Sequence, residues 1–281
     1  MKAFLSGFVA ILLAIAVPAS AQTLAAGTKV RIATEGAYKP WNFRDPKGKL
    51  AGFEIDLVRM LCADLAITCD ITTENWARML PQLNAGAFDA VFAGMSITKI
   101  RKQQARFSTP YATTPAVFVT RNGSRTPNTR ATDLVLPPVT NLDDESLLAI
   151  REAFLNAEIG VQAGTTHEQF LREYIDGYGL IRAYGDQKSL DADLVSGELG
   201  AMLVSLGYAA PLIRSKAGDN LKISVPQLSG GPFGEGIGAA FRQDSVALEE
   251  AFSGAIKKRI ADGSVRELSI KWFELDVSAK R

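Results

Sequence analysis

"LNAGAFDAVFAGMS" (residues 83–96) is the most informative segment for the architecture, because a similar segment, "LVSGELGAMLVSLG" (194–207), follows in the second half of the chain. Each has the pattern of a helix end, a glycine that stops the helix, and a short buried strand that starts with alanine. This unit is common, so chance similarity is the alternative. If the two copies are related, they predict two similar lobes whose strands end at one shared crevice, where open α/β sheets bind ligands.

Strand-like and helix-like segments alternate along the rest of the chain. Strands are predicted at 29–34, 69–74, 88–94, 116–121, 158–164, 199–205 and 234–242, and helices at 52–67, 76–86, 165–175, 187–197, 245–260 and 264–273. This alternation is typical of an α/β fold. Pro81 is expected to disturb the helix at 76–86. The polar, proline-containing stretch from Asn122 to about Asp144 is predicted to be a loop or linker.

The first residues, "MKAFLSGFVAILLAIAVPASAQ", have the features of a secretory signal. Lys2 gives a positive start, residues 8–17 form a short apolar run, and residues 19–21 form an A-x-A cleavage site. A membrane anchor is the alternative, but a span needs ~20 apolar residues and this run is shorter. We therefore expect export to the periplasm, with the signal at 1–21 removed after Ala21.

The composition is that of an ordinary globular protein. The 281-residue chain is 47% hydrophobic and 22% charged. It has 31 basic and 30 acidic side chains, so removal of Lys2 with the signal leaves a net charge of zero. The sequence has no basic tract of the kind that nucleic acid or anionic lipid requires, and we expect no nucleic-acid partner.

The two cysteines are Cys62 and Cys69, in "CADLAITC". In an exported protein such a pair is interpreted first as a disulfide, here closing a small loop with a modest gain in stability. Two thiols and a single histidine do not make a four-ligand cage, so no metal site is expected. The spacing also differs from the C-x-x-C redox motif.

Catalytic motifs are sparse in this sequence. The only histidine is His167, and neither a G-x-S-x-G elbow nor a G-x-x-x-x-G-K-[ST] loop is present. The glycine-rich "GGPFGEGIG" (230–238) does not open a helix, so we interpret it as a turn into a strand. We expect a binding protein without a cofactor and not an enzyme.

The segment "MSITKIR", after the strand predicted at 88–94, has the composition of a carboxylate site. Ser96 and Thr98 offer hydroxyl groups, and the turn offers backbone N–H groups. Arg101 offers a planar fork that pairs with both oxygens of a carboxylate. Taken alone, Arg101 would be interpreted as an ordinary surface arginine.

A second anion-binding segment, "AGTTHE", follows the strand that starts at Glu158. Thr165 and Thr166 occupy the start of a predicted helix, where free N–H groups and the helix dipole favour an anion. Simple capping of the helix is the alternative for this pair. Together with Arg101, the segment suggests two lobes that close on one anion.

The stretch "TEGAYKPW" (34–41) places an acid among aromatic residues, which suits a flat cation such as guanidinium. It contains Glu35, Tyr38 and Trp41, and Trp76 opens the following helix. The alternative is that Tyr38 and Trp41 belong to the core and that Glu35 is solvated.

These segments together resemble the periplasmic solute-binding proteins of polar amino-acid and opine ABC importers. The matching segments are "TEGAYKPWNF", "GKLAGFEIDLVRMLCADL", "LPQLNAGAFDAVFAGMSITKIRKQQARFSTPY", "GVQAGTTHEQF" and "IADGSVRELSIKWF". They span nearly all of the mature chain and are specific as an ordered set. The C-x6-C pair also resembles the disulfide of the lysine/arginine/ornithine and histidine binders.

The resemblance implies an α/β fold of the type II periplasmic-binding-protein class, with two lobes joined by two crossover strands. Lobe 1 would hold residues 28–119 and 230–281, lobe 2 residues 122–227, and the crossovers would lie near 117–123 and 225–232. Closure of the lobes on the ligand would produce the form that the membrane permease recognises. A monomer is expected.

Site residues follow from the resemblance by position. The α-carboxylate site falls on Ser96, Arg101 and Thr166, with backbone help near Gly94. The aromatic positions match Tyr38 and Trp76, the acidic position that meets a basic side chain matches Glu35, and His167 replaces a polar residue beside the carboxylate site.

One position departs from the amino-acid binders of this family. They usually place an aspartate after the second-lobe strand to hold the α-ammonium, and here Ser205 stands there. A buried ammonium without a carboxylate is poorly compensated. Opines are secondary amines whose second carboxylate arm could neutralise the ammonium and use His167 or Ser205. Trp76 and a longer insertion around 125–157 also resemble the octopine/nopaline type, so an arginine-derived opine is the expected ligand, and otherwise a cationic amino acid.

Two other functions remain open at this point. An enzyme on the same fold, similar to cyclohexadienyl dehydratase, would need a general acid or base, for which Glu35 and His167 are the candidates. A binding protein that delivers its ligand to a sensor rather than a permease would have the same sequence features.

Overall fold

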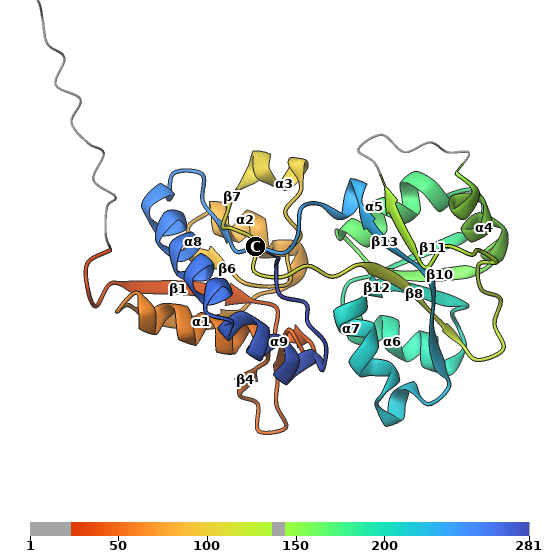
Figure 1. The fold of residues 1–281 in the computed structure, drawn as a ribbon, viewed down its shortest axis with the longest axis horizontal. Helices are drawn as coiled ribbons and strands as arrows, with labels where there is room; N and C mark the ends of the chain where they lie inside the picture. Colours follow the sequence, from red (N-terminus) through yellow and green to blue (C-terminus); the bar gives the residue numbers. More distant parts are fainter. Residues whose placement is uncertain (1–23, 137–143, 281) are drawn as a thin grey trace, which may run out of the picture.

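The computed structural model describes residues 24–136 and 144–280. The predicted signal at 1–21 lies outside them, as does the last part of the predicted loop before Asp144. Figure 1 shows two halves, each with a sheet and its own helices, joined by segments that cross between them. Within the described ranges, no helix is long and apolar enough to cross a membrane.

The first lobe is built on a five-stranded sheet with the strand order β5-β1-β6-β14-β7. The strands are β1 (Lys29–Thr34), β5 (Thr68–Thr73), β6 (Ala90–Val91), β7 (Arg106–Phe107) and β14 (Ala240–Phe241). The helices are α1 (Phe53–Asp64), α2 (Met79–Asn84), α3 (Lys99–Gln104), α8 (Val246–Ala261) and α9 (Ser264–Phe273). Val30 and Ile32 of β1 pack with α1, α8 and α9, whereas Ala33 packs with α2. A parallel strand buried on both faces therefore carries helices on both sides.

The second lobe is built on a six-stranded sheet with the strand order β11-β10-β12-β8-β13-β9. The strands are β8 (Ala116–Arg121), β9 (Asp133–Leu136), β10 (Glu158–Gln162), β11 (Leu180–Tyr184), β12 (Ala201–Ser205) and β13 (Leu221–Gly230). The helices are α4 (Glu145–Ala153), α5 (Thr166–Phe170), α6 (Gln187–Ser196) and α7 (Leu206–Ile213). Phe118 packs in the core under α4 and α5, and its neighbours Val117 and Val119 pack in the core under α6 and α7.

Two segments of chain cross between the lobes side by side. In the first lobe, Ile237 N–H donates to the Ala112 carbonyl oxygen at 2.8 Å. In the second lobe, β8 begins at Ala116 and pairs with β13. This topology agrees with the predicted α/β fold of two joined lobes. The lobe limits given above remain a prediction.

Several local expectations were wrong. The strands predicted at 88–94 and 234–242 are only Ala90–Val91 and Ala240–Phe241, and a turn with Gly94 at φ 62 lies shortly after the first of them. The helix predicted at 76–86 is not continuous: a 3-10 helix at Trp76–Arg78 precedes α2, as the expected disturbance by Pro81 suggested. Pro81 is the third residue of α2, where its missing N–H has no intrahelical partner to lose. The predicted loop after Asn122 contains β9, which pairs in parallel with β13.

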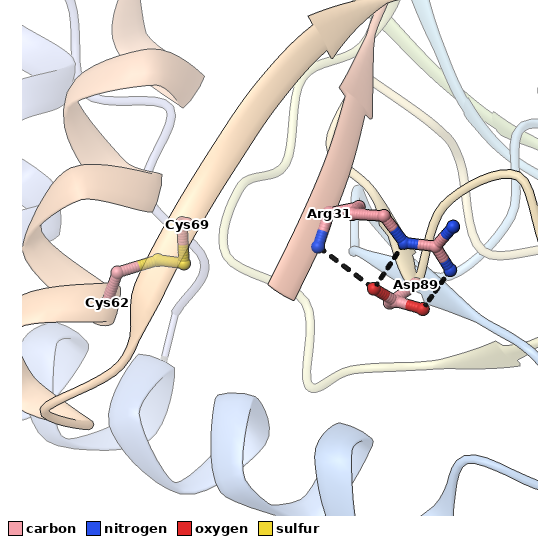
Figure 2. The surroundings of a disulfide bond; sticks show 4 residues. All are labelled: Arg31, Cys62, Cys69 and Asp89. Carbon is pink, nitrogen blue, oxygen red and sulfur yellow. Dashed lines mark hydrogen bonds and ion pairs between the residues drawn. A yellow bond between two sulfur atoms is a disulfide. The ribbon is translucent and has the colours of Figure 1, made fainter. Parts of the chain in front are cut away.

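Cys62 at the end of α1 and Cys69 in β5 form a disulfide, with Cα atoms 6.2 Å apart. Figure 2 shows that it ties the helix to the strand beside β1, where Arg31 pairs with Asp89 through both carboxylate oxygens. The predicted cysteine pairing is thus present, and it stabilises the outer edge of the first lobe.

Candidate ligand-binding site

A cavity lies between the lobes, at the ends of strands from both sheets. The first lobe contributes Glu35, Tyr38, Trp76, Ala93, Gly94, Ser96 and Arg101, and the second contributes Gln162, Thr165, Thr166, His167, Gln187, Leu203 and Val204. All predicted ligand-binding residues except Ser205 therefore line one cavity. Gln162 and Gln187 were not anticipated.

This cavity continues into a second chamber beside the crossing segments. The chambers share Tyr38, Gly94, Ser96, Thr166 and His167. Around the second chamber stand Ser205 and further hydroxyl groups, those of Thr113, Thr114 and Ser229. We call the first space the arginine chamber, because it contains Arg101, and the second the hinge chamber. The cleft is therefore longer than one subsite.

Arg101 is held at the start of α3 by a capping turn, in which Thr98 Oγ1 accepts from the Arg101 backbone N–H at 3.2 Å. Its guanidinium donates to the carbonyl oxygens of Ser96 at 3.0 Å and Gly164 at 3.2 Å. It also lies 5.2 Å from the centre of the Trp76 ring. Burial lowers the pKa of Arg101 to about 10. None of the ion pairs among the described residues includes Arg101, which lines the cavity as a partly buried cation.

Of the two threonines at the start of α5, Thr165 caps the helix and Thr166 faces the cavity. Thr165 caps α5: its Oγ1 accepts from the Glu168 N–H at 3.2 Å and donates to the Gln162 carbonyl at 2.7 Å. Thr166 is only 5% exposed and lines both chambers. The capping explanation therefore accounts for Thr165, while Thr166 faces the site.

His167 follows on α5 and also lines both chambers, with its ring 5.8 Å from the Phe233 ring. Burial and the nearby charge of Arg101 lower the pKa of His167 to about 4. The imidazole is therefore neutral near pH 7, and it can donate or accept a hydrogen bond without adding charge.

Glu35 follows β1 and reaches across to the second lobe, where its carboxylate accepts from Gln162 Nε2 at 2.7 Å. Burial, together with the charges of Asp186 and Glu54, raises the pKa of Glu35 to about 7, although the hydrogen bond from Gln162 acts in the opposite direction. The acid is partly buried between the lobes and does not stand free on the surface. It contributes the one carboxylate that lines the arginine chamber.

Tyr38 and Ser205 meet across the cleft. The Tyr38 hydroxyl lies 2.9 Å from Ser205 Oγ, and the Tyr38 ring stacks on Tyr208 of α7 at 4.7 Å. The Tyr208 hydroxyl donates to Asp191. Trp41, by contrast, is fully buried in the core of the first lobe. The core explanation thus holds for Trp41, whereas Tyr38 faces the cleft.

The backbone N–H of Gly94 donates to Glu54 at 2.6 Å. This amide is therefore occupied in the structure, and Gly94 contributes to the cavity wall. A Cβ at Gly94 would lie 3.7 Å from the Tyr38 ring, so the glycine leaves room between these two sides of the site.

Comparison with known proteins gives a consistent result. Residues 30–275 match the family described as bacterial extracellular solute-binding proteins, family 3. The chain is 32% identical to the octopine-binding periplasmic protein of Rhizobium meliloti, over 92% of this chain and 94% of that one. Among solved structures, a periplasmic binding protein of Salmonella typhimurium with high arginine specificity superposes with a TM-score of 0.75 at 26% identity, covering 88% of this chain and 100% of the other.

A further structure has a bearing on catalysis. An ancestral amino-acid-binding protein, described as a precursor of cyclohexadienyl dehydratase, superposes with a TM-score of 0.70 at 26% identity, covering 87% of this chain and 95% of the other. The relatives named here are nonetheless binding proteins. The two-lobe α/β fold and the resemblance seen in the sequence are confirmed, and the chain belongs to family 3 of the bacterial extracellular solute-binding proteins.

Proposed function

We propose that the protein is the periplasmic ligand-binding component of an ABC importer, and that it binds an arginine-derived opine or a cationic amino acid between its lobes. The observation that carries this proposal is the partly buried guanidinium of Arg101, which contacts carbonyl oxygens and an aromatic ring at the cavity wall. A ligand carboxylate would compensate this charge through two parallel hydrogen bonds.

The other wall of the arginine chamber suits a cationic group. Glu35 is the carboxylate of this chamber, and Tyr38 and Trp76 supply aromatic faces. A ligand guanidinium beside Glu35 would favour the ionised form of that carboxyl. A ligand with a carboxylate at one end and a guanidinium at the other would thus meet an opposite charge at both ends.

The hinge chamber favours an opine over a plain amino acid. Its hydroxyl groups, with neutral His167, can donate hydrogen bonds to a second carboxylate arm. Ser205 carries no charge to hold a primary ammonium, and its Oγ lies beside the Tyr38 hydroxyl. The similarity to an octopine-binding protein supports the same ligand class. In this proposal, the second arm of the ligand lies in the hinge chamber.

We place the protein in the periplasm as a monomer after removal of residues 1–21. Closure of the two lobes around the ligand would create the surface that a membrane permease recognises. A sensor in place of the permease would use the same closed form.

Catalysis is the second candidate, and one observation favours it. A carboxyl group with a pKa of about 7 in a cleft is suited to general acid–base chemistry, and Glu35 is such a group. The ancestral structure named above shows that the fold has been associated with a dehydratase lineage. Fold similarity does not establish the reaction, so turnover has to be tested directly.

A thermal-shift panel combined with analysis of the recovered ligand tests this proposal. Octopine and nopaline are expected to raise the melting temperature, because a ligand that binds only the folded state stabilises it. The ligand should be recovered unchanged by mass spectrometry. A panel of opines and basic amino acids without any shift would contradict ligand binding of this class. Formation of product from prephenate or arogenate would instead support the enzyme.

Closure of the empty cleft is expected to depend on pH through Glu35. The pKa of Glu35 is raised to about 7 in this closed cleft from an ordinary value of 4.5, so closure takes up a proton. The stabilisation of the closed form is complete below the pKa of the open form and is lost as the pH rises through about 7. The radius of gyration of the ligand-free protein, measured by solution scattering, should therefore decrease as the pH is lowered from 7 to ~5.

The variant Glu35→Gln should abolish this pH dependence, and Glu173→Gln, at an exposed position of the second lobe, should retain it. The burial-lowered pKa of His167, about 4, places its titration below this window. A wild-type radius of gyration that is constant from pH 5 to pH 8, or an unchanged profile in Glu35→Gln, would contradict the role of Glu35.

A further inference from the structure

Glu54 is a fully buried carboxylate that lies behind the cleft and does not line either chamber. It stands in the first turn of α1, where the helix dipole favours a negative charge. Its carboxylate accepts hydrogen bonds from Asn42 Nδ2 at 2.7 Å, from the Gly94 N–H at 2.6 Å and from the Tyr111 hydroxyl. The ion pairs of the described residues do not include Glu54. Burial raises the pKa of this carboxyl, and the hydrogen bonds from Tyr111, Gly94 and Asn42 act against that rise.

Asn42 extends this network to the other wall of the site. Asn42 Oδ1 accepts from the Gly36 N–H at 2.7 Å, and this contact fixes which way the amide group points. Nδ2 must then face Glu54 as a donor, and the Glu54 oxygen must accept. Gly36 follows Glu35 directly and precedes Tyr38 by two residues, whereas Gly94 precedes Ser96 by two. One carboxylate therefore holds the loop of the cation-binding residues and the loop of the carboxylate-binding residues.

We propose that Glu54 is a positioning residue that sets the distance and orientation of these two ligand-binding loops, 35–38 and 94–96, relative to each other. The inference rests on the proposed function. A ligand that bridges Arg101 and Glu35 is recognised at both ends. A small relative shift of the loops therefore lowers its affinity more than it lowers the affinity of a ligand that is held at one end. Glu54 thereby governs discrimination between a cationic side chain and a neutral one of the same shape.

Glu54→Gln is the diagnostic variant, because it preserves size but not acceptor capacity. If the glutamine oxygen accepts from the Gly94 N–H, the glutamine NH2 group faces the NH2 group of Asn42. Asn42 then loses its hydrogen bond either to residue 54 or to Gly36. If the glutamine is reversed, its NH2 group faces the Gly94 N–H. In either case one loop loses its hydrogen bond. Asn42→Ala removes the hydrogen bonds to Glu54 and to Gly36, and it leaves the contact between Glu54 and Gly94 in place.

Tyr111→Phe is the matched control. It removes the third donor to Glu54 from an equally buried position and leaves both loop contacts in place. Any general loss of stability from weakening this buried network should therefore appear in both Tyr111→Phe and Glu54→Gln.

The test compares affinities for L-arginine and L-citrulline, which differ in the charge of the side-chain end. In Glu54→Gln and Asn42→Ala, the arginine-to-citrulline affinity ratio should fall by about tenfold. In Tyr111→Phe it should stay at the wild-type value. A ratio that is unchanged in Glu54→Gln, or that falls equally in Tyr111→Phe, would overturn the proposal, because a purely structural role lowers both affinities by one factor.

Amide hydrogen exchange separates this inference from the proposed ligand. Without any ligand, Glu54→Gln should speed exchange at Gly36 or Gly94, and Tyr111→Phe should leave both protected. Protection of both amides in Glu54→Gln would refute the coupling of the loops. If the wild-type protein binds neither arginine nor an opine but the exchange result holds, the proposed function fails and the coupling stands.

Discussion

Replacement of Arg101 by alanine is expected to abolish ligand binding. The carboxylate of the ligand would then be buried in the closed cleft without a cation, and an unpaired buried charge costs about 3–5 kcal/mol, equivalent to a loss of more than a hundredfold in affinity. Arg101→Lys keeps the charge but lacks the planar fork, so it should be intermediate. Titration calorimetry measures both effects.

The same variant should not destabilise the ligand-free protein. Burial lowers the pKa of Arg101 to about 10, which means that the empty site holds this cation at a cost. The free energy of unfolding of Arg101→Ala should therefore equal or exceed that of the wild type in chemical denaturation. Arg59→Ala, with a side chain 60% exposed, is the control for removal of an arginine. Affinity of Arg101→Ala within threefold of wild type would refute the assignment.

Replacement of Ser205 by aspartate is expected to reverse the ligand preference. The new carboxylate would compensate the primary ammonium of an amino acid and repel the second carboxylate of an opine. Both effects act in a partly buried site, so the octopine-to-arginine affinity ratio should fall by about a hundredfold or more. Aspartate is also a good N-cap, so it should preserve the start of α7, where Ser205 Oγ accepts from the Tyr208 N–H at 3.3 Å.

Ser205→Asn separates charge from size in this experiment. Asparagine caps helices as well as aspartate does but carries no charge, so its octopine-to-arginine ratio should stay close to wild type. Affinities from titration calorimetry of the wild type and both variants decide the question. An unchanged ratio in Ser205→Asp, or equal effects of the two variants, would contradict the role of charge at this position.

Much of the site could be predicted because its residues directly follow buried strands. Ser96 and Arg101 come soon after β6, and Thr166 and His167 come soon after β10. The ends of such strands meet at one edge of a sheet, so local sequence was sufficient to bring these groups together. Gln162 also follows this pattern, because it is the polar residue that ends the apolar strand β10.

Other features could not be predicted because they depend on contacts between distant segments. β9 has four residues and is held by pairing with β13, nearly a hundred residues later. Tyr208 packs in the core of the second lobe and stacks on Tyr38 of the first, which no local pattern reveals. Glu54 is buried on α1, and its partners Asn42, Gly94 and Tyr111 come from other segments of the chain.

The decisive measurement is the affinity of the wild-type protein for octopine and for L-arginine, determined side by side by titration calorimetry. We expect binding of one ligand per chain, with octopine bound about tenfold or more tightly than arginine, because only the opine has a second carboxylate arm that fills the hinge chamber and neutralises its own ammonium group. Arginine that binds more tightly than octopine and nopaline would contradict the opine assignment. The absence of heat with every opine and basic amino acid would contradict the account as a whole.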